Sequence, residues 1–554
     1  MPHATFPFRY LLPSLLAPVL LLLGACGGDA TLRDTSVRDL PSVDSAIIDR
    51  HLTELASDKY GGRLPFSEGE GLTLDYLERE LEAIGLQPGN GDSYRQEVPM
   101  VEITGHPAEE IELALPQGEV IWQLGEDYIT FTDKAVEEVS VTDSEVIFAG
   151  FGIVAPEYGW NDYEGLDVRG KTVVVMVNDP GYYLEDSTLF KGSTMTYYGR
   201  YTYKYEEAAR QGAAACLVIH EQGAAGYPWF VVQSSWTGER LNLESDGQPQ
   251  VEVAGWITID AARELFVASG VTGIRWFEEA ASADFDPIPL STRLTTTVRN
   301  DLRFDKSYNI IATLPGAERP DEHLIYTAHW DHIGVGPAVN GDSIYNGALD
   351  NASGVAQLLA MAEAFTELPR APERSIDFLF VTAEEQGLWG SAYYVNNPII
   401  PLAQTVANIN IDGVNPIGPA ADLTITGMGH SDMDDLAGAA AERQGRYVQG
   451  GQEPEKGYFY RSDHFNFAKK GVPVLYADGG YEHATLGKAY AQQQKDEFVS
   501  QRYHQPADEY TSGAWPLGGA VQDAELLMDV GLQLANSERW PKWRESSEFF
   551  VTRQ

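Results

Sequence analysis

Five short segments of the chain carry side chains that bind metal ions in proteins, and most of them come directly after a predicted strand. They combine His, Asp or Glu with small or turn-forming residues and span residues 327–332, 347–354, 382–391, 410–413 and 503–508. The loops at the carboxyl ends of strands in an open α/β sheet converge on one crevice, so side chains far apart in sequence can meet there. Because zinc accepts imidazole and carboxylate ligands, the sequence predicts a metal-dependent site at these strand ends.

In two of the segments, neighbouring side chains could take different roles in one metal site. His329 and Asp331 would lie on the same side of an alternating strand, so Asp331 could hold one ring nitrogen of His329 while the other binds metal. Glu384 and Glu385 follow the apolar run 376–381. Adjacent glutamates at a strand end can act separately, because one can bind metal while its neighbour accepts a proton from activated water.

Each segment taken alone also has a purely structural explanation. Asp350 and Asn351 precede a predicted helix and could cap its N-terminus. Asp412 fits a turn, and the pair 384–385 fits the acidic first turn of a helix. A lone His329 would more often be structural than a ligand. The occurrence of all five segments in one order is what favours metal chemistry over these local explanations.

The surrounding pattern predicts the elements that would position these side chains. Apolar strands alternate with helices from about Leu294 to Trp543, which predicts an α/β fold with a mixed, largely parallel sheet and helices on both faces. The main expected strands are 307–314, 323–328, 375–382, 406–411 and 472–477, and the main expected helix is 350–368. Earlier in the chain, apolar residues from Ile47 to Leu86 recur at helical spacing, and Gly85–Pro88 ends that helix.

A second zone, from about Val120 to Asp286, is richer in strand-forming residues and is predicted to be a compact insert. It holds the β-rich runs 145–153 and 172–178 and a helical stretch that leads into the strand around Cys216, a residue expected to be a small buried hydrophobe. The predicted organisation is a signal peptide at 1–25, a linker at 26–45, the main domain at 46–119 and 294–543, and the insert at 120–286.

The composition is that of an acidic globular protein. Of 554 residues, 43% are hydrophobic and 22% are charged, and 82 Asp and Glu against 38 Lys and Arg give a net charge of −44. Such a field repels phosphate backbones, so nucleic acid is not an expected partner. The same field would attract cationic ligands and metal ions.

The first 25 residues have the features of an export signal. Arg9 precedes an apolar run at Leu11–Leu23 that two prolines interrupt, and this run is too short for a confident membrane span. The ending Leu23–Cys26 resembles a bacterial lipobox, which implies that Cys26 carries the lipid and is the protein's only contact with a membrane. An ordinary signal peptide cut nearby is the alternative. Gly27 in place of aspartate favours the periplasmic side of the outer membrane.

The ordered set of segments resembles the co-catalytic zinc exopeptidase family, which includes bacterial leucyl aminopeptidases, glutamate carboxypeptidase II and the non-enzymatic transferrin receptor. Residues 52–63 and 76–88 look like the N-terminal signature of that family. In the insert, residues 150–152, 170–173 and 208–219 look like its protease-associated domain. The resemblance implies the zinc exopeptidase fold over nearly the whole mature chain.

The resemblance also implies a role for each site residue. His329 and Asp412 would bind one zinc ion, Glu385 and His504 would bind the other, and Asp350 would bridge both. Two such ions, about 3.5–4 Å apart, share a carboxylate and a hydroxide nucleophile. The remaining roles fall to Glu384 as general base, Asp331 as the partner of His329 and Tyr503 as a possible donor to the oxyanion, with stacking or packing as its alternative.

Two other histidines compete with His504 as the last ligand. His464 and His483 also lie in loops near predicted strand ends. His504 is preferred because the final histidine of the family is likewise flanked by a tyrosine and a nearby aspartate, here Tyr503 and Asp508.

The leading functional hypothesis is an aminopeptidase that acts on peptides, since an acidic cleft would suit a cationic α-amino group. A glutamate carboxypeptidase-like enzyme would need basic residues for the substrate carboxylates. A glutaminyl cyclase-like enzyme would normally use one zinc ion. A receptor-like binding lipoprotein could keep the fold but need not keep the ligands. The sequence leaves the side-chain preference, the length of the substrate and the oligomeric state open.

Overall fold

The computed structural model describes residues 41–550 except 237, 246 and 272–275. The predicted signal peptide, Cys26 and most of the predicted linker therefore lie outside the described residues. Cys216 is buried within a strand, as expected for a small hydrophobe. Within the described part of the chain, none of the helices combines the length and the hydropathy of a membrane span.

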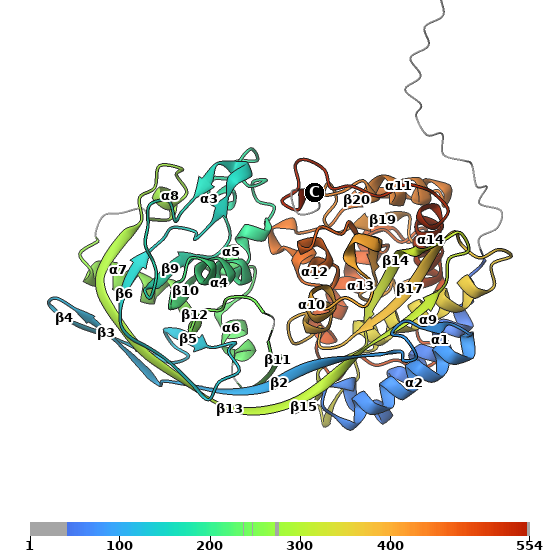
Figure 1. Ribbon diagram of the computed structural model, residues 1–554, viewed down its shortest axis with the longest axis horizontal. Helices are drawn as coiled ribbons and strands as arrows, with labels where there is room; N and C mark the ends of the chain where they lie inside the picture. Colours follow the sequence, from blue (N-terminus) through green and yellow to red (C-terminus); the bar gives the residue numbers. More distant parts are fainter. Residues whose placement is uncertain (1–40, 237, 246, 272–275, 551–554) are drawn as a thin grey trace, which may run out of the picture. The chain divides into compact units, whose positions relative to one another are not determined.

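A mixed sheet forms the centre of the main domain (Figure 1). Its strands in spatial order are β13 (Ile288–Leu314), β17 (Arg374–Val381), β14 (Arg319–His329), β18 (Thr405–Asn410), β21 (Val474–Asp478), β19 (Asp422–Ile425) and β20 (Tyr447–Gly450). Four of the six neighbouring pairs are parallel, and the pairs β13/β17 and β21/β19 are antiparallel. The predicted α/β class with a mixed, largely parallel sheet is confirmed.

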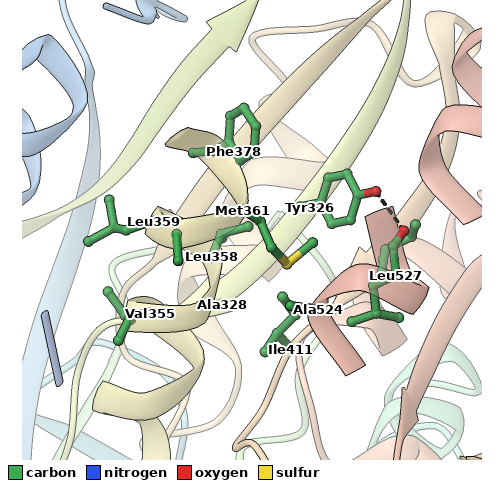
Figure 2. Close-up of a cluster of buried hydrophobic side chains, with 14 of the residues drawn as sticks. Tyr326, Ala328, Val355, Leu358, Leu359, Met361, Phe378, Ile411, Ala524 and Leu527 are labelled. Carbon is green, nitrogen blue, oxygen red and sulfur yellow. Dashed lines mark hydrogen bonds between the residues drawn. The ribbon is translucent and has the colours of Figure 1, made fainter. Parts of the chain in front are cut away.

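One face of this sheet packs against long helices. Tyr326 and Phe378 point toward α9 (Ser353–Thr366) and α14 (Gly518–Ala535), as Figure 2 shows. The Tyr326 hydroxyl donates a hydrogen bond to the Leu527 carbonyl at 2.9 Å, which satisfies the polar end of a fully buried ring. This cluster fixes the strands whose carboxyl ends carry the predicted ligands.

The opposite face is covered as well. Ile325 and Leu379 are the sequence neighbours of Tyr326 and Phe378 and point to the opposite face. They pack in a separate cluster with α10 (Trp389–Asn396) and α12 (His464–Lys469). This alternation is what a strand buried on both faces requires. The prediction of helices on both faces is therefore confirmed.

The N-terminal helices pack against the same cluster as α9. They are α1 (Ser45–Leu55) and α2 (Glu68–Ile84), with a 3₁₀ segment at Asp58–Arg63 between them. The Ser67 side chain accepts a hydrogen bond from the Glu70 amide, and Gly85 closes α2 in the left-handed conformation. The predicted helical zone and its end at Gly85 are confirmed.

Further helices, strands and turns outside the lobe described next complete the main domain. It comprises β1 (Gln87–Pro88), β2 (Arg95–Pro107), β15 (Gly334–Val339), β16 (Asp342–Tyr345), α11 (Met433–Arg443), α13 (Gly487–Gln501), one π-helical turn at Ala348–Ala352 and 3₁₀ turns at Leu402–Gln404, Pro454–Lys456 and Tyr458–Tyr460.

Residues 110–298 form two further buried clusters and are called the β-rich lobe. Its strands are β3 (Glu110–Leu115), β4 (Gly118–Gln123), β5 (Tyr128–Phe131), β6 (Glu138–Phe148), β7 (Val154–Ala155), β8 (Trp160–Asn161), β9 (Thr172–Met176), β10 (Ala215–His220), β11 (Glu239–Leu243) and β12 (Val253–Thr258). Its helices are α3 (Pro180–Leu184), α4 (Tyr201–Arg210), α5 (Gln222–Ala225), α6 (Trp229–Ser235), α7 (Ile259–Ala268) and α8 (Trp276–Ala280), with 3₁₀ turns at Pro156–Tyr158 and Tyr197–Gly199.

Two predicted boundaries of the insert differ from the strands observed. The boundary between 119 and 120 falls inside the β3–β4 hairpin, whose residues Ile111 and Trp122 share one cluster. Strand β13 runs without a break from 288 to 314 and pairs with β2 from Pro107 to Arg95 (Figure 1). Because these long strands continue from one core into the other, hydrophobic patterning alone did not locate their ends. The assignment of the lobe to the protease-associated type stays a prediction.

Candidate metal centre

The predicted ligands come from the carboxyl ends of three neighbouring parallel strands and from two loops. His329 is the last residue of β14, Glu385 follows β17 and Asp412 follows β18. Asp350 precedes α9, and His504 follows α13. The structure brings all five together, as expected for ligands at the carboxyl ends of parallel strands.

The first group of ligands surrounds His329. Its Nε2 atom lies 3.2 Å from a carboxylate oxygen of Asp350 and 3.2 Å from one of Asp412. Its Nδ1 atom donates a hydrogen bond to the carbonyl oxygen of Asp331 at 3.2 Å. This contact leaves the lone pair of Nε2 facing the two carboxylates, which is the tautomer that a metal ligand requires.

The second group surrounds Glu385. The Nε2 atom of His504 lies 3.2 Å from Glu385 Oε2 and 3.3 Å from Asp350 Oδ2. The other oxygen of Asp350, Oδ1, is the one that faces His329. The two oxygens of one carboxylate thus face two different histidines, which is the arrangement of a bridging ligand.

His332 joins this second group and was not among the predicted site residues. Its Nδ1 atom donates to Glu385 Oε1 at 2.5 Å, and His332, Asp350 and Glu385 lie close enough together to share one metal ion. Gly347 makes room for this ring, because a Cβ atom there would lie 2.4 Å from His332 Cγ. The signal was available, since His332 ends the first ligand-bearing segment.

Asp331 has a different contact from the one predicted. Its carboxylate lies 3.8 Å from His329 Nδ1, and it accepts hydrogen bonds from the backbone amides of Glu384 at 3.0 Å and Glu385 at 3.4 Å. Asp331 therefore positions the loop of the two glutamates, while its carbonyl oxygen orients His329. Glu384 itself lies beside the first group, with Oε2 3.9 Å from His329 Nε2.

The two adjacent glutamates differ in their electrostatic surroundings. Burial raises the pKa of Glu384, His329 opposes this, and the negative charges of Asp412 and Glu385 add to it, so the pKa lies well above its usual value. Burial also raises the pKa of Glu385, but the charges of the neighbouring histidines, His504 first, lower it to about 2. Of the two adjacent carboxylates, Glu384 therefore has the higher proton affinity and Glu385 the lower.

The donor set fits a zinc centre. Among the described residues, His332 Nε2 has no hydrogen-bond partner, although the atom is buried. A buried nitrogen without a partner costs free energy, whereas neutral imidazole nitrogens are ordinary zinc ligands. His504 also holds a left-handed backbone conformation, with φ at 55°. Imidazole and carboxylate donors at these distances match the ligand types that zinc prefers.

Two side chains outside the predicted set hold the ligand loops. Asn351 accepts hydrogen bonds from the Gly354 amide at 3.0 Å and from the Gly413 amide at 2.8 Å. Asp508 accepts from the amides of Leu349 at 3.0 Å and of Asp350 at 3.2 Å. The Asn351 side chain therefore satisfies an amide in the first turn of α9, and the carboxylate of Asp350 is left for the metal centre.

The buried side chain of Arg63 holds the same loops by hydrogen bonds to their backbone. The Arg63 guanidinium donates to the carbonyl oxygens of Trp330 at 2.9 Å, Asn346 at 2.6 Å and Gly347 at 2.9 Å. The side chain is 1% exposed, and it also reaches the carbonyl of Leu55 at 2.9 Å. Arg63 lies in the predicted N-terminal signature, but its contacts depend on segments almost 300 residues away.

The competing histidines and Tyr503 occupy other positions. His464 is fully buried beside the ring of Phe459, and His483 Nδ1 accepts hydrogen bonds from the amides of Thr485 and Leu486 at 3.1 Å. Within the described residues neither forms an ion pair with a carboxylate, whereas His504 contacts Asp350 and Glu385. The Tyr503 ring stacks on His504 with centroids 3.9 Å apart, which is the packing alternative, and its role toward an oxyanion stays a prediction.

A cavity of about 1630 Å³ opens beside the metal centre. Its described lining includes Asp350, Glu384, Glu385, Asp412 and His504, together with side chains of the β-rich lobe. Eight Lys and Arg and eight Asp and Glu residues line it. Four of the acids belong to the centre, so the rest of the lining has eight cations against four acids. The acidic cleft expected from the composition is therefore confined to the metal centre.

Sequence comparison identifies relatives over the part of the chain that carries this centre. Residues 309–528 match the model of Peptidase family M28. Leupeptin-inactivating enzyme 1 of Streptomyces exfoliatus is 30% identical over 213 residues, which are 37% of this chain and 44% of that protein. A probable leucine aminopeptidase 2 of Aspergillus oryzae is 34% identical over 186 residues, which are 34% and 31% of the two chains. The chain thus spans less than half the length of these relatives.

Comparison of structures gives a related result. An aminopeptidase from Aneurinibacillus sp. strain AM-1 is similar with a TM-score of 0.48 and 19% sequence identity, and the match covers 90% of this chain and 96% of that one. Every side chain of the metal centre described above lies within the segment that the family model matches. Residues 309–528 therefore hold the whole metal centre and match the model of Peptidase family M28.

Proposed function

We propose that the protein is a zinc-dependent exopeptidase, an aminopeptidase that removes N-terminal residues from peptides with the help of two zinc ions. One observation carries the proposal: the two carboxylate oxygens of Asp350 face the Nε2 atoms of His329 and His504 at 3.2 and 3.3 Å. Asp350 lies between two histidines, and each histidine has a further carboxylate beside it, Asp412 or Glu385. This arrangement supports two metal ions and not one.

The remaining residues support hydrolysis at this centre. His329 and Asp412 would hold one ion and Glu385 and His504 the other. When bound, the ions supply a Lewis acid for the scissile carbonyl and an activated nucleophile at neutral pH. Glu384 lies beside the centre without belonging to either ligand group, so its carboxylate would take the proton of the attacking water and return it to the leaving amine.

The names of the matched relatives favour an aminopeptidase over the other hypotheses. A leucine aminopeptidase and a leupeptin-inactivating enzyme are among them. A carboxypeptidase, a glutaminyl cyclase-like transferase and a non-catalytic receptor remain the alternatives, and each would give a different product in the experiment below.

The test is mass spectrometry of a mixed peptide pool after incubation with the purified protein, with and without a zinc chelator. Loss of single residues from N-termini that the chelator abolishes is the expected result. Loss from C-termini would move the assignment to a carboxypeptidase, and pyroglutamyl products would indicate a cyclase. No change with zinc verified as bound would indicate a binding protein.

A matched variant tests the mechanism. Glu384→Gln should keep two zinc ions per chain and an unchanged melting temperature but lose at least about 100-fold in kcat, because it removes the proton acceptor and leaves the ligands in place. Ordinary turnover in Glu384→Gln would contradict the assigned role of this residue.

We also propose that residues 1–25 export the protein and that lipid on Cys26 anchors it, on the strength of the lipobox-like sequence alone. Cys26→Ser should move the protein from the membrane fraction to the soluble periplasmic fraction. Equal partitioning of both forms would argue for an ordinary signal peptide.

A further inference from the structure

The loop that follows β17, residues 383–390, is called the glutamate loop. It closes on itself, because the Glu384 carbonyl accepts hydrogen bonds from the amides of Gly387 and Leu388 at 3.0 and 2.9 Å. Ala383 and Leu388 hold left-handed backbone conformations, with φ at 52° and 63°. Such conformations cost free energy in residues other than glycine, so contacts outside the loop are needed to hold it.

The two glutamates of this loop differ in what fixes their carboxylates. The Glu385 carboxylate contacts His332 at 2.5 Å and His504 at 3.2 Å. The Glu384 carboxylate lies 3.9 Å from His329 Nε2 and forms no hydrogen bond within the part of the chain that the structure describes. The position of Glu384 therefore depends on the backbone of the loop, whereas Glu385 is also held through its side chain.

Asp331 holds one side of the glutamate loop, and a strand of the β-rich lobe holds another. The amide of Leu241, in β11, donates a hydrogen bond to Gln386 Oε1 at 3.3 Å. The carbonyl oxygen of Leu241 accepts one from Trp389 Nε1 at 2.8 Å. Both backbone polar groups of one residue of the lobe thus contact side chains of the loop.

Apolar packing surrounds these two hydrogen bonds. Leu241 and Leu243 share a buried cluster with Ala383, and Trp389 packs against it. Gly387 leaves room for the indole, because a Cβ atom there would lie 3.0 Å from Trp389 Cε2. Since hydrogen bonds are directional and the apolar side chains exclude water from them, this contact favours one conformation of the loop.

We propose that Gln386 and Trp389 are positioning residues that hold Glu384 at the metal centre through their contacts with Leu241. The β-rich lobe thereby takes part in the reaction and is more than a wall of the cavity. The proposal rests on the proposed exopeptidase function, in which Glu384 accepts the proton of the attacking water. A displacement of about 1 Å of a catalytic group can lower the rate by about 100-fold.

The first experiment measures kcat, KM and zinc content of Trp389→Phe and Gln386→Met. Trp389→Phe removes the indole donor but keeps an aromatic ring. It should lose roughly 10–100-fold in kcat on a leucyl peptide and change KM by less than about threefold. Both zinc ions should stay bound, because the side-chain contacts of Glu385 remain. Gln386→Met should lose less, since its hydrogen bond is the longer one. Loss of zinc, or an effect on KM alone, would overturn the proposal.

Trp229→Phe is the matched control. Its indole also donates to a backbone carbonyl at 2.8 Å, that of Gly125, but this contact lies within the β-rich lobe and away from the glutamate loop. Its kcat should stay within about twofold of the wild type. A loss equal to that of Trp389→Phe would show that the effect is not specific to the glutamate loop.

A double variant tests whether Trp389 acts through Glu384. In the Glu384→Gln background, Trp389→Phe should lower the residual kcat by less than about twofold, because no proton acceptor is left to position. The same 10–100-fold loss in both backgrounds would show that Trp389 acts independently of Glu384, which would overturn the assigned role.

Hydrogen–deuterium exchange separates this proposal from the proposed function, because it needs no turnover. Peptides that cover residues 383–390 should exchange at least about threefold faster in Trp389→Phe than in the wild type, and Trp229→Phe should leave them unchanged. A protein that cleaves no peptide but shows the faster exchange would refute the exopeptidase and retain the contact between lobe and loop. Unchanged exchange in Trp389→Phe would refute the positioning role alone.

Discussion

At the scale of single residues, Asp350 is the side chain on which the two halves of the metal centre depend. Its Oδ1 faces His329 and its Oδ2 faces His504, while Asn351 and Asp508 fix the backbone on either side. These neighbours orient the carboxylate without competing for it, as the outer contacts of metal ligands commonly do. Changes at Asp350 should therefore affect both ions, whereas changes at the other ligands should affect one.

Asp350→Asn should lower the zinc content from two ions per chain to fewer than one. The amide removes one negative charge and one of the two oxygens that can bridge. Elemental analysis of the purified protein measures the zinc content. Asp463→Asn is the control, because Asp463 is buried nearby and accepts from Ser391 Oγ at 2.5 Å but belongs to neither ligand group. Two zinc ions in Asp350→Asn would contradict the bridge.

His504→Gln and His332→Gln should separate a ligand from a positioning residue. We expect His504→Gln to lose one zinc ion, since its Nε2 lies between two carboxylates. His332→Gln should keep both ions with about 10–100-fold weaker affinity for one of them, because His332 orients Glu385 through Nδ1. Competition with a chelator measures both affinities. If only His332→Gln loses an ion, His332 is the ligand and His504 the positioning residue.

At the scale of elements, the buried His51 joins α1 to α2 and makes the stability of this region depend on pH. Arg50 donates to His51 Nε2 at 3.1 Å, so the proton of the neutral ring lies on Nδ1 and is donated to the Tyr76 hydroxyl at 2.6 Å. Burial lowers the pKa of His51 to about 4, and the charge of Arg50 adds to this, while Glu80 opposes it. The folded state therefore favours neutral His51.

The free energy of unfolding should fall between pH 8 and pH 5 partly through this residue. The unfolded ring titrates near pH 6.5, so the contribution of His51 is complete above that pH and is lost as the pH falls toward about 4. The loss at pH 5 is about 2 kcal/mol. Urea unfolding of the wild type and His51→Gln measures it. The variant should be less stable at pH 8 but depend less on pH, and parallel pH profiles would contradict the assignment.

At the scale of the whole molecule, Glu548 near the C-terminus links the β-rich lobe to the main domain. Its carboxylate contacts Lys191 at 3.0 Å and accepts from the Tyr460 hydroxyl at 2.6 Å, and the side chain is 3% exposed. Burial raises the pKa of Glu548, but the charges of His430 and Lys191 lower it to about 2. This ion pair, in which the Lys191 side chain is 30% exposed, stabilises a wall of the cavity.

Glu548→Gln should cost on the order of 3 kcal/mol of stability, because it leaves Lys191 without its buried partner. A double-mutant cycle with Lys191→Gln should give a coupling free energy above about 1 kcal/mol. Glu538→Gln, at an exposed position, serves as the control and should change little. Additive effects of the two substitutions would show that the ion pair does not connect the lobes.

Much of this organisation could be predicted because it depends on local patterns. Apolar runs that alternate with helices located the strands β14, β17 and β18, and the residue types directly after them identified the ligand set. The predicted boundary at 119–120 divides the β3–β4 hairpin and the predicted start at 294 lies inside β13, since the ends of long paired strands depend on their partners and not on their own periodicity.

The sequence by itself determined the α/β class, the order of the ligand segments and the chemistry of their side chains. Only the tertiary structure decided that His332 joins Glu385 and that Asp331 holds the glutamate loop. The physical reason is the range of the interactions. Helical and strand periodicity act between near neighbours in the chain, whereas these contacts join segments that lie 53 residues apart.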